Sequence, residues 1–222
     1  MALAAYHDAM SDDAIRAVLF DFGGVILTSP FEAFAHYEAR NGLPVGFIRQ
    51  VNATNHHHNA WARLERNEVT LAEFATEFEA EAAGLGQRVD GRAVIECLRG
   101  EVRPEMVAAL HHIDDAGLAL ALLTNNFLTG TAEWSSGGSF SELVALFDVV
   151  VESSQVGVRK PERRFYEIAL ERLGIEPSEA VFLDDLGINL KPARDLGMAT
   201  IKVGDPAVAL AELSEILGIA LS

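Results

Sequence analysis

The sequence predicts an α/β protein with a doubly wound parallel sheet and a helical segment inserted after the first strand. Continuous apolar runs, the first of them Ala17-Val18-Leu19-Phe20, are typical of strands that are buried on both faces. Helical patterns separate the later runs, which indicates right-handed crossovers between parallel strands. Between the first run and the second, the pattern is helical throughout. We therefore predict a core of residues 1–29 and 100–222 and an α-helical cap of residues 30–99.

The first apolar run ends in Asp21, and two glycines follow within three residues. In open α/β sheets the carboxyl edge of the strands is where ligands bind. Gly23 and Gly24 carry no side chain, so the backbone can come close to whatever Asp21 faces. A strand that simply ends in an aspartate beside a glycine turn would show the same pattern. The stretch is therefore a candidate site that needs support from the rest of the chain.

Proline, glycine and capping residues mark the expected ends of the helices. In the insertion, Thr70 and Glu73 form a capping-box signature, and apolar residues follow at helical spacing. In the second half, the expected helices cover 104–117, 161–174, about 192–197 and the segment from 206 onward. The expected strands lie at 118–123, 149–151, 180–183 and 199–203. A loose leader is expected at 1–13, the first strand is expected to begin near Ile15, and a polar loop is expected at 134–140.

The composition limits the partners that this chain can have. Its formal charge of −16 argues against nucleic acid or an anionic membrane surface as a partner. No apolar run is long enough to insert into a membrane, and the N-terminus lacks the order of a secretory signal, so we expect a soluble cytoplasmic protein. Cys97 is the one cysteine, and it lies in a helical pattern typical of a small buried residue. A homodimer is compatible with the sequence.

Polar residues follow three of the predicted strands. They are Asp21 after the first, Thr124 and Asn125 after the second, and Asp184 and Asp185 after the third. Because the carboxyl ends of parallel strands lie on one edge of a sheet, these residues are expected to meet. Lys160 lies just before the expected helix at Pro161 and is expected to join them.

This combination of residue types suits a metal and an anionic substrate. Asp21 and Asp185 would repel each other unless a cation lay between them, and carboxylate oxygens are the ligands that Mg²⁺ prefers. Thr124 and Asn125 offer hydroxyl, amide and N–H groups to an anionic oxygen, and Lys160 offers a positive charge. The sequence therefore predicts a magnesium site that binds a small anionic molecule.

These residues resemble the four motifs of the haloacid dehalogenase-like superfamily in order and spacing. The matching segments are Asp21-Phe-Gly-Gly-Val, Leu-Leu-Thr124-Asn125, Lys160-Pro161-Glu162 and Leu183-Asp184-Asp185. The second half is also similar to the N-terminal phosphatase domain of soluble epoxide hydrolase and to related domains of acyl-CoA dehydrogenase family proteins. This similarity lies in the segments 152–162 and 181–198, whereas the cap matches poorly.

The resemblance implies a Rossmann-like core that hydrolyses a small organic or lipid phosphate monoester. It implies that Asp21 is the nucleophile and forms an aspartyl-phosphate, which water then hydrolyses. It also implies that Mg²⁺ is bound by Asp21, Asp185 and the backbone carbonyl of Gly23. The roles implied for the other residues are phosphoryl binding for Thr124 and Asn125, charge stabilisation for Lys160, and support of the metal for Asp184 and Asn189.

Gly23 departs from the family pattern, because the family's phosphatases usually carry at this position an aspartate that acts as general acid and base. A positioned proton donor contributes roughly 10²–10⁴-fold to a rate, so its loss would slow hydrolysis. Three interpretations stay open: substrates with good leaving groups, a proton from a cap residue or the substrate, or a site kept for binding alone. Halide-displacing members also lack this aspartate. They need neither metal nor the acidic pair at 184–185, so a 2-haloacid dehalogenase ranks below a phosphatase.

Three adjacent histidines, His56 to His58, lie in the predicted cap, where they would overhang the site. Consecutive side chains on a helix point in different directions, so we expect one of them to line the pocket rather than three to bind a metal. The candidate substrate contacts of the cap are His57, His58 and Trp61. A histidine here could replace the missing acid, since its ordinary pKa lies near neutrality.

Overall fold

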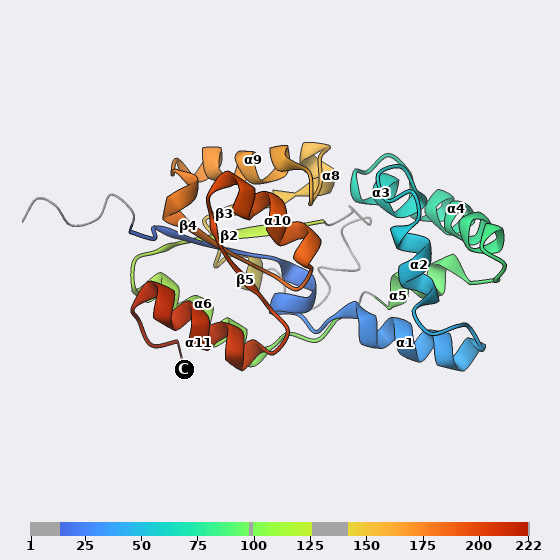
Figure 1. Cartoon of the computed structure of the whole chain (residues 1–222), viewed down its shortest axis with the longest axis horizontal. Coiled ribbons are helices and arrows are strands. Elements are labelled where there is room, and N and C mark those ends of the chain that lie inside the picture. The colour runs from blue at the N-terminus through green and yellow to red at the C-terminus, as the bar shows by residue number, and fades with distance from the viewer. Residues whose placement is uncertain (1–13, 98–99, 126–141, 222) are drawn as a thin grey trace, which may run out of the picture.

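A five-stranded parallel sheet forms the centre of the core (Figure 1). The computed structural model describes residues 14–97, 100–125 and 142–221. The strands are β1 (Ala17–Phe20), β2 (Ala119–Thr124), β3 (Val149–Glu152), β4 (Ala180–Asp184) and β5 (Ala199–Lys202). Their order is β3-β2-β1-β4-β5, so β2 and β3 lie on one side of β1, and β4 and β5 lie on the other. The strand order therefore reverses at β1, and such a switch point is where open α/β sheets bind ligands.

Helices cover both faces of the sheet, which confirms the doubly wound α/β prediction. One face packs against α6 (Pro104–Asp115) and α11 (Pro206–Leu217). The other packs against α9 (Arg163–Leu173) and α10 (Gly187–Leu196). In β1, Val18 and Phe20 belong to the first apolar cluster, and Ala17 and Leu19 belong to the second. Burial on both faces explains why this strand is an unbroken apolar run.

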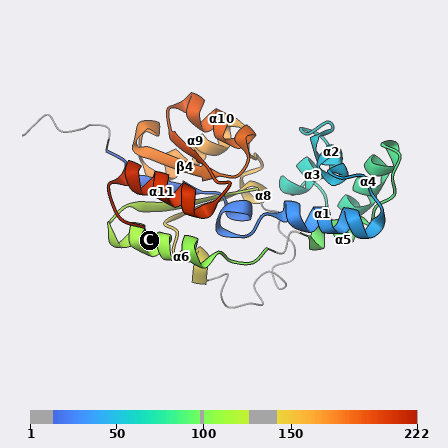
Figure 2. The ribbon, with the colours of Figure 1, turned by 60° about the horizontal axis from the view of Figure 1, so that its bottom comes forward.

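The described part of the inserted segment forms five helices that pack around an apolar core of their own (Figure 2). They are α1 (Pro30–Asn41), α2 (Phe47–Ala53), α3 (Ala60–Glu65), α4 (Leu71–Gly84) and α5 (Gly91–Glu96). The expected capping box at the start of α4 is present, because Thr70 and Glu73 exchange hydrogen bonds. Phe74 and Phe78 stack at 5.3 Å in the centre of this helical group. Its limits as a domain, residues 30–99, stay a prediction.

Two chain segments connect the helical group to the core, and they are hydrogen-bonded to each other. Leu27 and Val102 form an antiparallel bridge. The N–H of Thr28 donates to the carbonyl of Glu101 at 2.8 Å, and the N–H of Arg103 donates to the carbonyl of Ile26 at 2.9 Å. The entry and exit of the helical segment therefore lie side by side at the carboxyl edge of β1.

Several expected element ends are wrong by a few residues. The first strand begins at Ala17, where the ladder to β2 and β4 starts, and not near Ile15. The helix expected from Pro161 begins at Arg163, because Glu162 has extended backbone angles and is the N-cap. The helix expected around 192–197 already begins at Gly187. The leader at 1–13 and the polar loop at 134–140 lie outside the described residues.

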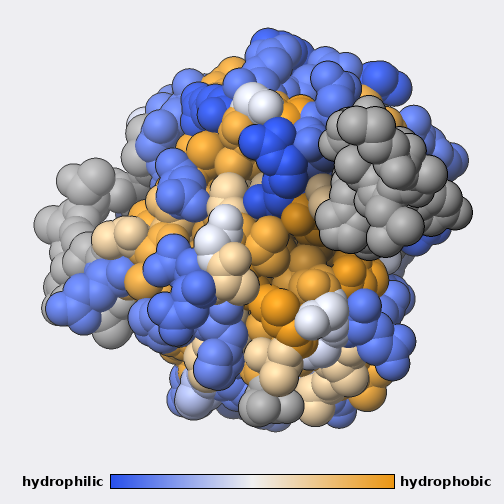
Figure 3. All heavy atoms as spheres, turned by 90° about the vertical axis from the view of Figure 1, so that its left-hand side faces the viewer, coloured by the Kyte–Doolittle hydropathy of each residue, from blue (hydrophilic) through white to orange (hydrophobic). Residues whose placement is uncertain are grey.

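The end of the core that faces away from the helical group is shown in Figure 3. Apolar residues gather in the middle of this face and hydrophilic residues surround them. Among the described residues, no helix combines the length and the apolar character needed to cross a membrane. A short helix, α8 (Ser153–Val156), follows β3 at the opposite edge, near the helical group.

Candidate active site

The carboxyl edge of the sheet brings the predicted site residues together. Phe20 pairs with Leu122 on β2 and with Leu183 on β4, so the three strands end at the same level. Asp21, Thr124, Lys160 and Asp185 all line one cavity. Oxygens of Asp21, Asp184 and Asp185 lie within 4.8 Å of one another, and among the described residues this is the group of acidic, His or Cys side chains that could hold a metal.

The turn after β1 fixes Asp21 and allows Asp185 to approach. The N–H of Asp21 donates to the carbonyl of Leu183 at 2.9 Å, which continues the β1–β4 pairing by one residue. The N–H of Phe22 donates to Oδ1 of Asp21 at 2.6 Å. Gly24 has φ of +82°, and a Cβ at this position would collide with the carboxylate of Asp185. Glycine is therefore needed at position 24, where the turn passes the carboxylate of Asp185.

Lys160 joins two of the three carboxylates. Its Nζ lies 2.7 Å from Oδ1 of Asp21 and 2.8 Å from Oδ2 of Asp184, and the residue is 1% exposed. Burial alone would lower the pKa of Lys160, but Asp184 and Asp21 outweigh burial, so the pKa is raised and the ammonium stays charged.

Even with Lys160 present, the acidic group is short of positive charge. Burial raises the pKa of Asp21 well above its ordinary value, and Asp184 and Asp185 add to the rise against the opposing effect of Lys160. Burial and the charge of Asp184 raise the pKa of Asp185 to about 6. A divalent cation among these oxygens would relieve the repulsion, and the donor set fits a hard cation such as Mg²⁺.

Asp184 is held by the protein on several sides. Besides Lys160, it accepts hydrogen bonds from Nδ2 of Asn189 at 3.1 Å on both oxygens and from the N–H of Leu186 at 2.8 Å. The hydroxyl of Tyr166 in turn donates to the carbonyl of Asn189 at 2.6 Å. The structure thus places Asn189 behind Asp184, and the metal-support roles of both residues stay predictions.

The side chain of Asn125 is engaged by the protein. Its Oδ1 accepts from the N–H of Lys160 at 2.8 Å, and its Nδ2 donates to the Lys160 carbonyl at 3.0 Å and to Glu65 at 3.3 Å. Asn125 therefore fixes the loop that carries Lys160. The phosphoryl-binding role of Asn125 stays a prediction.

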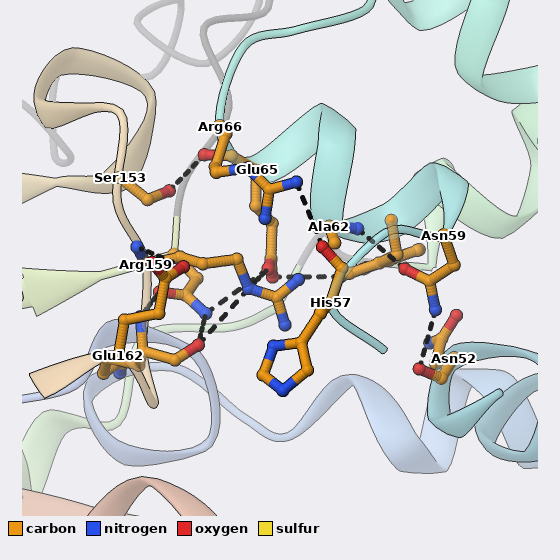
Figure 4. Close-up of polar contacts among 12 residues, drawn as sticks. Asn52, His57, Asn59, Ala62, Glu65, Arg66, Ser153, Arg159 and Glu162 are labelled. Atoms are coloured by element: carbon orange, nitrogen blue, oxygen red, sulfur yellow. Dashed lines mark hydrogen bonds and ion pairs between the residues drawn. The ribbon is translucent and has the colours of Figure 1, made fainter. Parts of the chain in front are cut away.

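Glu65, at the end of α3, connects the helical group to the core (Figure 4). Its carboxylate accepts from the indole of Trp61 at 3.0 Å, from Asn125, and from the guanidinium of Arg159 at 2.9 Å. Its backbone carbonyl accepts from the hydroxyl of Ser153. Burial raises the pKa of Glu65, and Arg159 opposes the rise. One residue of α3 therefore contacts three separate segments of the core.

A cavity of about 510 Å³ lies between the helical group and the sheet edge. Its helical side presents Phe31, Phe34 and Trp61, and its core side ends at Asp21 and Lys160. His56 lines it, whereas His57 and His58 are not among its lining residues. The rings of His56 and His57 lie 3.9 Å apart, and burial, His57 and Arg159 lower the pKa of His56. The structure therefore places Trp61 and His56 at the cavity, and His57 and His58 outside it.

A sequence model of the haloacid dehalogenase-like hydrolases matches residues 15–197. The chain belongs to this family. It is 40% identical to acyl-CoA dehydrogenase family member 10 of Mus musculus over 93% of this chain and 19% of that protein. It is 35% identical to bifunctional epoxide hydrolase 2 of Sus scrofa over 94% of this chain and 40% of that protein. The chain thus spans two fifths or less of these two relatives. A sesquiterpene phosphatase of Aspergillus oryzae is 24% identical over 91% of this chain and 97% of its own length.

Solved structures of the family share the fold. A family enzyme from Bacteroides thetaiotaomicron, in complex with magnesium and inorganic phosphate, has a TM-score of 0.59 and 20% identity, with 86% of this chain and 96% of that chain covered. These matches confirm the family resemblance and the Rossmann-like fold predicted from the sequence. The chain is accordingly a hydrolase with an acidic cluster suited to a metal.

Sequence reasoning missed Glu65 and Arg159. Glu65 follows Trp61 by four residues, so both lie on one side of α3, and this spacing was the available signal. An acidic residue on a helix is usually solvated, and nothing in the pattern indicates that this one is buried. Arg159 precedes Lys160 directly, but its partner comes from the helical segment, and that pairing depends on the tertiary fold.

Proposed function

We propose that the chain hydrolyses phosphate monoesters in a magnesium-dependent reaction, with Asp21 as the nucleophile. The observation that carries the proposal is the group of three carboxylates within 4.8 Å, two of them bonded to the buried Lys160. This arrangement pairs a nucleophilic carboxylate with places for a cation and for phosphoryl oxygens. The similarity to a phosphatase over nearly the whole length of both chains supports the same reaction.

The metal would be held by Asp21, Asp185 and the Gly23 carbonyl. When bound, it would neutralise negative charge on the phosphoryl group and on the surrounding carboxylates. Lys160 and the N–H of Phe22 both contact Oδ1 of Asp21 and hold the carboxylate in place. A bond from one carboxylate oxygen of Asp21 to phosphorus would form as the ester bond breaks and the alcohol leaves. Water would then release phosphate and restore the carboxylate.

The leaving alcohol needs a proton when its own pKa is high, and Gly23 cannot supply one. A Cβ on Gly23 would meet nothing within 4 Å, so there is open space where the family's phosphatases carry the aspartate. Substrates with good leaving groups, such as aryl phosphates, would be turned over without that proton. For other substrates, His56 is one titratable group of the cap at the cavity that could donate it.

The cavity favours a small-molecule phosphate with an apolar body. Phe31, Phe34 and Trp61 give its helical side an aromatic wall, and a volume of about 510 Å³ is in the range of pockets for small organic ligands. A small organic or lipid phosphate would place its phosphate at Asp21 and its body along this wall. The homodimer and the cytoplasmic location stay predictions.

The test is hydrolysis of 4-nitrophenyl phosphate by the purified chain with Mg²⁺ and again with EDTA. We expect turnover that EDTA abolishes, and no turnover by Asp21→Asn. The control is Asp195→Asn, which removes the same charge from an exposed position on α10 and should keep the activity. Turnover that survives Asp21→Asn would overturn the assignment of the nucleophile.

A second candidate function, a binding module without catalysis, is favoured by Gly23 alone. Its signature would be binding of Mg²⁺ and inorganic phosphate with no turnover of the aryl phosphate. A 2-haloacid dehalogenase is disfavoured, because the paired acids at 184–185 have no use in a reaction that needs no metal.

A further inference from the structure

Two buried polar atoms, on residues that line the cavity, have no partner within the described part of the chain. They are Nη1 of Arg159 and Oδ1 of Asn52, and both residues line the cavity. Buried donors and acceptors are almost always hydrogen-bonded, because leaving one without a partner is costly. Two such atoms on residues that line one cavity indicate that a ligand or water completes their hydrogen bonding.

The guanidinium of Arg159 is held through its Nε, so its Nη1 is left without a protein partner among the described residues. Its Nε contacts Oε2 of Glu65 at 2.9 Å and the carbonyl of Lys160 at 3.3 Å. Both contacts use the same nitrogen, so neither uses the two terminal nitrogens. Figure 4 shows the side chain reaching from the core toward Glu65 and the helical group. A guanidinium fixed in this way needs little ordering to bind an oxygen ligand.

The positions of Arg159 and Asn52 place this polar group on the helical side of the cavity. Asn52 lies on α2, and Arg159 bonds to α3 through Glu65. The charge of Arg159 also acts on His56, which follows α2. Asp21, by contrast, is influenced by Lys160, Asp184 and Asp185 at the sheet edge. The two unpartnered atoms therefore belong to the part of the cavity that would hold the organic body of a substrate.

We propose that Arg159 and Asn52 form a second polar subsite, which binds an oxygen-bearing group, a carboxylate or a hydroxyl, on the organic body of the substrate. The proposal rests on the proposed function, since it takes the phosphate to lie at Asp21. Arg159 supplies a charged donor and Asn52 supplies the amide oxygen. A carboxylate would pair with the guanidinium, and a hydroxyl could accept from Arg159 and donate to Asn52. The substrate class is thus an apolar phosphate with a polar group away from the phosphate.

The experiment measures binding of alkylphosphonates, which cannot be hydrolysed, by calorimetry in the presence of Mg²⁺. Butyl to decyl chains are compared in three forms, with a methyl, hydroxyl or carboxylate group at the far end. We expect one chain length at which the hydroxyl or carboxylate form binds about tenfold or more tightly than the methyl form, as a charge-assisted hydrogen bond provides. The methyl series reports phosphate-site binding, and the polar series reports the subsite.

Variants of Arg159 and Asn52 test whether these residues cause the preference for the polar phosphonates. Arg159→Lys keeps a positive charge beside Glu65 but lacks the fork, and Asn52→Ala removes the unpartnered oxygen. Each should reduce the ratio of polar-form affinity to methyl-form affinity, which is the measure of the subsite. Arg88→Gln is the control, because Arg88 is exposed and outside the cavity lining, and it should keep the preference.

The possible results separate the two proposals. Suppose that the methyl forms bind and no polar form is preferred at any length. Water then completes the hydrogen bonding of the two atoms, and the proposed subsite is wrong, while the phosphate site stands. Arg49 also lines the cavity, 4.6 Å above the ring of Phe31, so a preference lost in Arg49→Gln but kept in Arg159→Lys would overturn the assignment as well. If no phosphonate binds, the phosphate site and the subsite both fail.

Discussion

Replacing Lys160 with Met should reveal how strongly the acidic group depends on its internal cation. Methionine has nearly the same length, so packing changes little and the main loss is the charge. Lys160 is 1% exposed and lies 2.7 Å from Asp21 and 2.8 Å from Asp184, so its removal leaves two buried carboxylates without their cation. Breaking a buried ion pair by removing one partner costs about 3–5 kcal/mol. That loss is a large part of the roughly 5–15 kcal/mol that stabilises a typical domain.

The assay is urea unfolding of the wild type and the variant, each with EDTA and with Mg²⁺. With EDTA, a loss of this size moves the midpoint by about 1–2 M urea, given a slope of about 2–3 kcal/mol/M. With Mg²⁺ the difference should shrink, because the more negative site of the variant gains more from the metal. Lys191→Met, at an exposed position on α10, is the control and should change little. Equal stability of the Lys160→Met variant and the wild type in EDTA would refute the reasoning.

Three further changes test other parts of the structure. Gly24→Ala forces a Cβ at φ of +82° into the Asp185 carboxylate, so we expect a loss of about 1–3 kcal/mol in urea unfolding and reduced turnover, whereas Gly42→Ala, at φ of +66° in open space, should cost less. Burial raises the pKa of Glu65, so the stability that it contributes is complete below its ordinary pKa and declines as the pH rises through the raised value. The free energy of unfolding of the wild type minus that of Glu65→Gln should therefore fall with rising pH, and a difference that rises would contradict the assigned shift. Phe78→Ala should cost about 3–5 kcal/mol by calorimetry or urea unfolding, because Phe78 is fully buried against Phe74, and Leu85→Ala at a 37% exposed position should cost far less.

Much of the fold could be predicted from the sequence, because the relevant signals are local. Strands buried on both faces appear as unbroken apolar runs, and Thr70 and Asp205 cap α4 and α11 as their side chains suggest. The meeting of Asp21, Thr124 and Asp185 follows from topology, since parallel strands end at one edge. These inferences need only the order of elements along the chain.

The remaining features depend on how separate elements pack, which no local pattern records. Glu65 is buried because α3 lies against the core, where its carboxylate accepts a hydrogen bond from Asn125 and pairs with Arg159. Which of three adjacent histidines faces the cavity depends on the exact turn between α2 and α3, and the structure places His56 there. The starts of α9 and α10 are also hard to predict from the sequence, because their N-cap residues, Glu162 and Leu186, make no side-chain capping hydrogen bond.

The antiparallel pair at Leu27 and Val102 has a consequence for how such a protein can diversify. A segment whose two ends are adjacent can be lengthened, shortened or exchanged without moving the elements that flank it. Here those flanking elements are β1 and α6, and β1 leads directly into Asp21. Exchange of the helices would replace the wall that contacts the organic body and leave the carboxylates and Lys160 in place. Grafting this segment onto another core of the family is therefore a direct route to new substrate preferences.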